Sequence, residues 1–313
     1  MEIIRMPYKT DVFGNPLYAK VAWSKGTESA KPTALVYHGG GLMVGSSEMV
    51  PQSQINYLVE RGFAVVIPNY RLAPQVTAKE VFADCEEAYE WAVGTLPDLM
   101  RSQHGIYLDS TRTVAFGHSS GGTIALHLAS CKPVKAVTAF YPSLFASDSS
   151  TSAHKPTSAP PFGMMPDFHP TLEEWATITP EGKQLSETPL AAPGTIPAPR
   201  NKWQMHTLKN GQWLPTLQPD GDYATLDPMT RITPEWCPVM LVQGELDNVP
   251  GSSLELAQRA EKATADAGVR EVRLEVVKGE GHMFDLPPMV GTTDLGAKWE
   301  AVRKGLDWLV DHV

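Results

Sequence analysis

The chain has 313 residues, of which 42% are hydrophobic, and a formal net charge of −9. The acidic balance and the lack of any basic block argue against nucleic acid or an anionic membrane surface as a partner. The sequence has no apolar run long enough for a signal peptide or a membrane span. Its three cysteines are widely spaced and form neither a disulfide framework nor a metal cluster, so the sequence predicts a cytoplasmic protein.

Strands and helices alternate along the chain, which predicts an α/β fold with a mostly parallel central sheet flanked by helices. An opening hairpin is expected first. Short apolar runs then predict six buried strands, and apolar residues at helical spacing predict helices between and after them. The hairpin covers 2–8 and 17–24; the strands are 33–37, 63–67, 113–116, 136–141, 238–242 and 272–277; helices are expected at 51–61, 79–95, 123–129, 252–267 and the C-terminus.

Residues 143–234 have a different composition from the rest of the chain. This segment holds 14 of the 27 prolines and also three tryptophans. A disordered segment would be poor in aromatic residues, so we expect irregular but ordered structure. The segment lies between two predicted core strands. The sequence therefore predicts a core formed by 1–142 and 235–313, with 143–234 inserted as a lid or cap over a binding site.

The sequence Gly117-His118-Ser119-Ser120-Gly121 lies between a predicted strand and a predicted helix. This is the G-x-S-x-G pattern of a nucleophile elbow, in the strand–turn–helix context that the motif requires. The glycines leave room for a tight turn, whose strain presents the serine hydroxyl above the sheet. We therefore expect Ser119 to be a catalytic nucleophile.

A serine nucleophile needs a base, and the base needs an orienting acid, which follow it in the chain order serine, acid, histidine. Of the two histidines after the insertion, His282 directly follows the last predicted strand, whereas His312 lies in the terminal helix. Glu245 and Asp247 both follow the preceding strand, and either could accept a hydrogen bond from the imidazole. We favour Asp247 because it lies further along the loop, clear of the strand end.

A glycine-rich loop, His38-Gly39-Gly40-Gly41, follows the first buried strand. Loops of this type donate backbone N–H groups to the oxyanion that forms during acyl transfer. The residue after the nucleophile, here Ser120, supplies a further N–H group. The loop therefore predicts an oxyanion hole.

Together with Asn69-Tyr70-Arg71-Leu72-Ala73-Pro74, these motifs resemble the α/β-hydrolase fold-3 family, the hormone-sensitive-lipase-like carboxylesterase group. The resemblance covers about 33–142 and 236–313. It implies an α/β-hydrolase fold, carboxylesterase activity without a cofactor, and oxyanion donors at Gly40, Gly41 and Ser120.

The chain departs from that family at three points. Its elbow reads Gly-His-Ser-Ser-Gly, where many of these esterases have Gly-Asp-Ser-Ala-Gly. Strands begin at Glu2, where the family has N-terminal cap helices, and the 143–234 insertion is unusually long and rich in proline. The binding cavity is therefore expected to differ, and the substrate cannot be inferred from the family.

The sequence thus predicts a serine hydrolase that cleaves a carboxylic ester of an apolar small molecule through an acyl-enzyme. Two alternatives remain open at this point. One is a thioesterase, lactonase or other acyl-processing enzyme of a specialised pathway, and the other is a ligand-binding pseudohydrolase. No metal is expected, because the remaining histidines lack ligand spacing.

Overall fold

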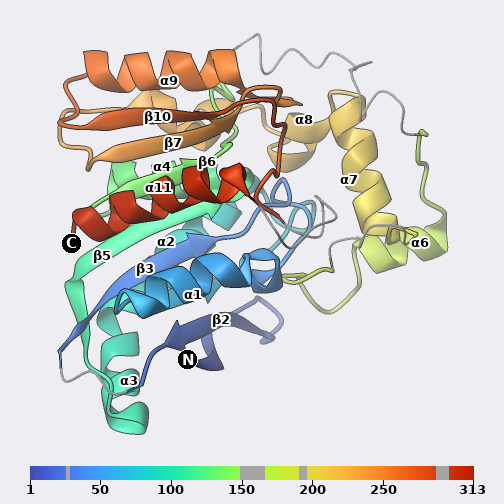
Figure 1. Ribbon diagram of the computed structural model, residues 1–313. Helices are drawn as coiled ribbons and strands as arrows, with labels where there is room; N and C mark the ends of the chain where they lie inside the picture. The colour runs from blue at the N-terminus through green and yellow to red at the C-terminus, as the bar shows by residue number, and fades with distance from the viewer. Residues whose placement is uncertain (26–28, 149–165, 190–195, 287–295) are drawn as a thin grey trace.

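The centre of the protein is an eight-stranded sheet with the order β1-β2-β4-β3-β5-β6-β7-β10 (Figure 1). The computed structural model describes residues 1–25, 29–148, 166–189, 196–286 and 296–313. Strand β2 pairs antiparallel with β1 and β4, and the strands from β4 to β10 pair in parallel, which confirms the predicted fold class. The bounds are β1 Glu2–Thr10, β2 Pro16–Trp23, β3 Lys31–Tyr37, β4 Ala64–Pro68, β5 Leu108–His118, β6 Val137–Phe140, β7 Val239–Gly244 and β10 Val272–Val277.

Helices cover both faces of the sheet. Helices α1 (Gln52–Glu60) and α11 (Ala297–Asp311) pack together on one face (Figure 1). Helices α2 (Ala78–Gly94), α4 (Ser120–Cys131) and α9 (Leu254–Asp266) contribute to the core on the other face. The sequence did not predict α3 (Leu96–His104), which follows α2 almost without interruption and ends at Gly105 in the left-handed conformation.

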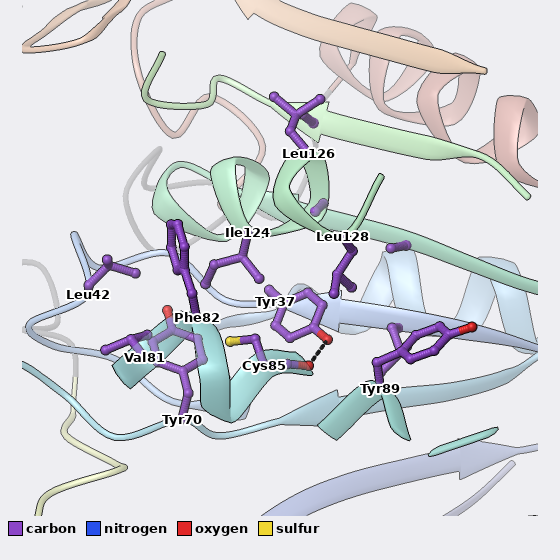
Figure 2. Close-up of a cluster of buried hydrophobic side chains, with 14 of the residues drawn as sticks. Tyr37, Leu42, Tyr70, Val81, Phe82, Cys85, Tyr89, Ile124, Leu126 and Leu128 are labelled. Carbon is purple, nitrogen blue, oxygen red and sulfur yellow. Dashed lines mark hydrogen bonds between the residues drawn. The ribbon is translucent and has the colours of Figure 1, made fainter. Parts of the chain in front are cut away.

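The core between α2, α4 and the sheet is closely packed (Figure 2). Side chains of Phe82 and Ile124 meet there over β3, and the Tyr37 hydroxyl donates a 3.0 Å hydrogen bond to the Cys85 carbonyl. Burial raises the pKa of the Cys85 thiol well above its usual value, and neighbouring carboxylates add to the effect. This cysteine is therefore a protonated packing residue, as its isolated position in the sequence suggests.

The described part of 143–234 lies at the carboxyl ends of the parallel strands (Figure 1). It contains α6 (Leu172–Ile178), α7 (Pro199–Lys209) and α8 (Trp213–Leu217). Trp203 and Trp213 are buried in the same hydrophobic cluster as residues of β3 and α2. The segment is thus packed onto the core by its aromatic side chains.

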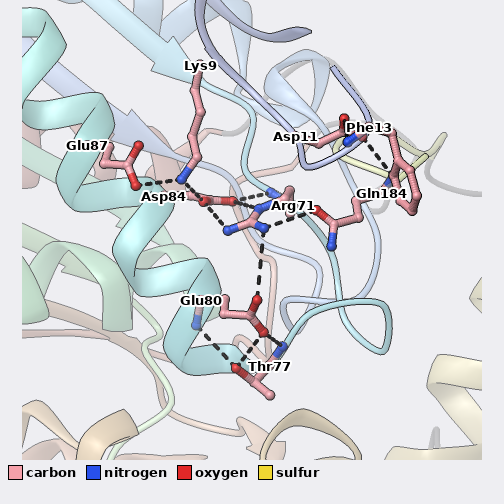
Figure 3. Close-up of polar contacts among 9 residues, drawn as sticks. All are labelled: Lys9, Asp11, Phe13, Arg71, Thr77, Glu80, Asp84, Glu87 and Gln184. Carbon is pink, nitrogen blue, oxygen red and sulfur yellow. Dashed lines mark hydrogen bonds and ion pairs between the residues drawn. The ribbon is translucent and has the colours of Figure 1, made fainter. Parts of the chain in front are cut away.

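A buried ion-pair network also joins the hairpin, α2 and the insertion (Figure 3). The Arg71 guanidinium binds the fully buried Asp84 carboxylate through Nε at 2.8 Å and Nη2 at 2.7 Å. Lys9 Nζ lies 2.7 Å from the same carboxylate, and Arg71 Nη1 donates to Gln184 Oε1 at 3.0 Å. Arg71, in the Asn-Tyr-Arg-Leu-Ala-Pro sequence, therefore has a structural role.

Replacing Asp84 with asparagine should lower the free energy of unfolding by about 3–5 kcal/mol, because Arg71 and Lys9 would lose their shared buried partner. Urea denaturation followed by circular dichroism measures the change. On α9, Asp266→Asn breaks an exposed ion pair with Lys262 and should cost at most about 1 kcal/mol. Equal costs for the two substitutions would contradict this account of the network.

Candidate active site

Ser119 lies at the turn between β5 and α4, in a strained backbone conformation with φ 55° and ψ −123°. The turn depends on its two glycines. A Cβ atom on Gly117 would lie 2.2 Å from the Gly121 carbonyl oxygen, and one on Gly121 would lie 2.1 Å from the Tyr37 carbonyl oxygen. Any side chain at either position would therefore force the strand, the turn and the helix apart.

The structure brings Ser119, His282 and Asp247 into one hydrogen-bonded chain. His282 Nε2 lies 2.9 Å from Ser119 Oγ, and His282 Nδ1 lies 2.7 Å from Asp247 Oδ2. His282 follows β10 and Asp247 follows β7, so both reach Ser119 from the carboxyl edge of the sheet. The arrangement matches that of a nucleophile, a base and an orienting acid.

Of the two candidate acids, Asp247 is the one placed beside His282. Its carboxylate is completely buried and also accepts from Gln243 Nε2 at 2.8 Å and from the backbone N–H of Val249 at 3.0 Å. Glu245 instead accepts from the backbone N–H of Gly279 at 2.8 Å, in an exposed position. The N-cap of α9 is Ser253, so Asp247 does not cap that helix.

Two further residues around the histidine carry no signal in the sequence. Ser252 Oγ lies 3.2 Å from Asp247 Oδ2 and donates to the Tyr141 carbonyl at 2.8 Å. The Tyr141 ring meets the His282 imidazole edge-on, with a centroid separation of 4.7 Å. Both residues limit the movement of Asp247 and His282, and only the folded chain brings them there.

The glycine loop runs beside the serine turn. A Cβ atom on Gly39 would lie 3.3 Å from that of Ser119. Gly40 and Gly41 have φ values of 114° and 60°, which side-chain-bearing residues rarely adopt. Within the described residues, the structure gives the N–H groups of Gly40 and Gly41 no acceptor, and the N–H of Ser120 belongs to the first turn of α4. All three are thus available to a ligand.

His38, at the start of this loop, is fully buried and stacks on Tyr70 with centroids 4.2 Å apart. Its Nδ1 lies 2.7 Å from the Gly39 carbonyl oxygen, and its buried Nε2 has no partner in the described structure. Burial lowers the pKa of His38 to about 4, against the opposing effect of the Gly39 carbonyl. At neutral pH the imidazole is uncharged and supports the loop by donating from Nδ1.

The pKa of His38 is lower in the folded than in the unfolded protein. At pH values between these two pKa values, the imidazole is therefore protonated in the unfolded protein and neutral in the folded protein. Acidification from about pH 6.5 to about pH 4 should therefore remove about 3 kcal/mol of unfolding free energy through this group. Denaturation curves at a series of pH values measure the loss. His38→Gln cannot titrate and should lose less over the same range; identical slopes would contradict the assignment.

His118, the neighbour of Ser119, points to the opposite side of the turn. Its Nε2 lies 2.9 Å from Gln54 Oε1 and 3.2 Å from the buried Asp285 carboxylate, which also accepts from Tyr141. Burial acts to raise the pKa of Asp285, but His118 and the hydrogen-bond donors outweigh it and hold the pKa below its usual value. This network supports the turn, and His282 is the imidazole in contact with Ser119 Oγ.

One group of side chains in the described residues has donor atoms close enough to hold a metal ion: Glu86, His127 and Cys131. These donors already serve an ion-pair network. His127 lies between Glu86, 2.8 Å from Nε2, and Arg231, 2.8 Å from Nδ1, and Lys132 binds the same glutamate. Arg231 and Lys132 are two cations beside this group, and burial raises the pKa of the Cys131 thiol to about 11, so the thiol stays protonated. The group is therefore unsuited to a divalent cation.

A pocket opens above Ser119 and His282, and the insertion forms one of its walls. Mostly apolar side chains line it, among them Met205, Leu208 and Trp213 of the insertion and Met283 and Leu286 beyond the histidine. Its polar lining includes the serine hydroxyl, the imidazole and the glycine loop, and also the side chains of Ser143, Gln204 and Ser252. Such a pocket suits an apolar group attached to a carbonyl.

The eight-stranded sheet and the strand–serine–helix turn define an α/β-hydrolase. A family model described as alpha/beta hydrolase fold matches residues 34–196, and the chain belongs to this family. Each helix in the described part of the chain is too short or too polar to traverse a lipid bilayer.

Similar structures are esterases and a protein of unknown function. An esterase from Thermogutta terrifontis superimposes with a TM-score of 0.62 over 98% of this chain and 91% of its own, at 17% identity. A Staphylococcus aureus protein of unknown function gives a TM-score of 0.71 over 99% of both chains, at 20% identity. At these identities the similarity establishes the shared fold.

Sequence relatives are found among much longer fungal proteins. A non-reducing polyketide synthase of Penicillium rubens is 30% identical over 90% of this chain, which corresponds to 12% of the synthase. A methylphloroacetophenone synthase of Cladonia uncialis is also 30% identical, over 89% of this chain and 12% of that enzyme. The chain therefore resembles one small part of these relatives.

Proposed function

We propose that the protein is a serine hydrolase that cleaves an acyl bond through a covalent acyl-enzyme. The observation that carries the proposal is the unbroken chain of hydrogen bonds from Ser119 Oγ through both imidazole nitrogens of His282 to Asp247. Serine alone is a weak nucleophile at neutral pH, and this arrangement supplies the base that removes its proton.

In the first half-reaction, Ser119 Oγ attacks the acyl carbon while its proton passes to His282 Nε2. Asp247 accepts from Nδ1–H, which keeps Nε2 unprotonated before the attack and stabilises the imidazolium afterwards. The N–H groups of Gly40, Gly41 and Ser120 stabilise the negative charge on the carbonyl oxygen. His282 then gives its proton to the leaving group. In the second half-reaction His282 Nε2 takes a proton from the attacking water and passes it to Ser119 Oγ as the acid is released.

The substrate class that we propose is an acyl chain of specialised metabolism, delivered as a thioester or an ester. Two observations support it: the apolar pocket above Ser119, and the similarity to a part of fungal polyketide synthases. Polyketide chains are carried as thioesters, so a thioester is the first acyl donor to test. A carboxylic ester of an apolar small molecule is the second, in keeping with the esterases that share the fold.

Trapping of the acyl-enzyme tests both donors. The protein is mixed with aromatic acyl thioesters of N-acetylcysteamine and with the matching p-nitrophenyl esters, then quenched in acid and analysed by intact-protein and peptide mass spectrometry. We expect an added acyl mass on the peptide with Ser119, and its absence from Ser119→Ala. A wild-type protein that gains no acyl mass and does not react with a fluorophosphonate would instead be a ligand-binding relative without catalysis.

A further inference from the structure

Side chains of the insertion bind the carbonyl groups of the glycine loop. Gln204 on α7 donates Nε2 to the Gly40 carbonyl oxygen at 2.7 Å. Trp213, the first residue of α8, donates Nε1 to the Gly41 carbonyl oxygen at 2.9 Å. Arg200, near the start of α7, adds a 2.5 Å hydrogen bond from Nε to the Met43 carbonyl oxygen. Three contacts thus connect the insertion to the carbonyl groups of residues 40, 41 and 43.

Peptide geometry gives these contacts a consequence on the other side of the loop. A carbonyl and the N–H of the next residue belong to one planar trans unit and point in opposite directions. The hydrogen bond from Gln204 to the Gly40 carbonyl therefore helps to fix the direction of the Gly41 N–H, together with the backbone N–H groups of Met43 and Val44 that donate to the same oxygen. The hydrogen bond from Trp213 fixes the peptide after Gly41, so both planes that flank this glycine are held.

The loop needs such anchors because glycine has few conformational restraints of its own. His38 holds the Gly39 carbonyl, and with it the N–H of Gly40, from within the core. The Gly40 carbonyl, and with it the N–H of Gly41, is held from within the loop by the backbone N–H groups of Met43 and Val44, both at 3.1 Å, and the insertion adds a side-chain donor to the same oxygen. Gln204 and Trp213 are 4% and 9% exposed, so water cannot readily replace them. A Cβ atom on Gly41 would lie 2.8 Å from Gln204 Nε2, which shows how closely the amide fits against the loop.

We propose that Gln204 and Trp213 are positioning residues of the oxyanion hole, so that the insertion completes the catalytic machinery as well as covering the pocket. This inference rests on the proposed function, since it assigns these side chains a role in stabilising the oxyanion. Donors that are already aimed at the developing charge stabilise it without reorganisation during the reaction. Without the two side-chain donors, only the backbone N–H groups of Met43 and Val44 hold the Gly40 carbonyl, and the direction of the Gly41 N–H is less closely defined.

The test uses Gln204→Met, which keeps the side-chain length, and Trp213→Phe, which keeps an aromatic ring; both remove the donor. For each variant we would measure the acylation rate and the affinity for a trifluoromethyl ketone, which forms an oxyanion-bearing adduct with Ser119. The corresponding methyl ketone, which stays a neutral ligand, reports on the pocket alone. We expect the acylation rate and the trifluoromethyl ketone affinity to fall together by up to about tenfold, and by more than the methyl ketone affinity, which also reports the altered pocket wall.

Two control variants remove similar hydrogen bonds elsewhere. Gln75→Met removes the side-chain amide that donates to the Lys183 carbonyl of the insertion at 2.7 Å and to the Pro180 carbonyl at 3.3 Å, and that accepts from the Leu185 N–H at 3.0 Å. Trp236→Phe breaks a 3.0 Å hydrogen bond to the Arg231 carbonyl. Both should change the unfolding midpoint without a selective loss of trifluoromethyl ketone affinity. If Gln204→Met fails to fold, Trp213→Phe still provides the test.

The outcomes separate the two proposals. A wild-type protein that forms no adduct with Ser119 overturns the proposed function itself. The positioning role alone is overturned if the wild-type protein forms the adduct but the Gln204 and Trp213 variants bind the trifluoromethyl ketone as tightly as their controls do. Parallel losses for both ketones would also overturn it, because they would indicate a damaged pocket.

Discussion

Replacing Ser119 with alanine should lower the rate of acyl-bond hydrolysis by about 10⁶-fold, because the acyl-enzyme route is lost altogether. The remaining groups still bind the substrate and donate to its carbonyl oxygen, so a residual acceleration of about 10³–10⁴ over water is expected. Steady-state hydrolysis of the best thioester or ester, followed by release of thiol or nitrophenolate, measures the change. The variant should fold normally, since the Ser119 side chain makes no packing contact that alanine cannot replace.

Ser120→Ala separates the two serines of the elbow. Ser120 contributes its backbone N–H, which alanine retains, and its buried hydroxyl has no partner in the described structure. The loss for Ser120→Ala should therefore be far smaller than that for Ser119→Ala. If the two substitutions reduced the rate equally, Ser119 would not be the nucleophile.

Replacing Asp247 with asparagine should lower the turnover rate by about 10⁴-fold. An asparagine can donate its amide N–H to His282 Nδ1, which would place the imidazole proton on Nε2. That nitrogen faces Ser119 Oγ at 2.9 Å and must be unprotonated to accept the serine proton. The substitution therefore leaves the side chains in place and removes the active tautomer.

Glu245→Gln is the matched control for the acid. Glu245 lies two residues away, follows the same strand, and binds the backbone of Gly279 rather than His282. Its substitution should leave turnover near the wild-type rate. A large loss with Glu245→Gln and a small loss with Asp247→Asn would reverse the assignment of the acid.

The parts of the site that the sequence predicts are those set by local chain signals. The Gly117–Gly121 turn needs glycines because of its own backbone contacts. His282 and Asp247 each follow an apolar strand, and the carboxyl ends of parallel strands meet at one edge of the sheet. Chain order, strand ends and turn chemistry thus suffice to propose the serine, the base and the acid.

Other parts depend on packing between distant segments and could not be predicted. Ser252 reaches Asp247 only because the short turn after β7 folds back on itself. Gln204 lies in α7, whose apolar and polar residues show little regular periodicity, and Trp213 begins the five-residue α8. Their partners are carbonyl groups about 170 residues earlier in the chain. Helix α3 was missed because α2 and α3 follow one another without a loop that would mark the boundary.

The contacts between α7, α8 and the glycine loop have a consequence for protein engineering. Residues that shape the pocket, such as Met205 and Leu208, lie on α7 beside Gln204, which lines the same pocket and donates to the Gly40 carbonyl. A chimera that receives a relative's cap to change its selectivity would exchange both sets together. Grafted segments should therefore keep a donor for the Gly40 and Gly41 carbonyls, and libraries that alter selectivity are better restricted to the neighbouring apolar positions.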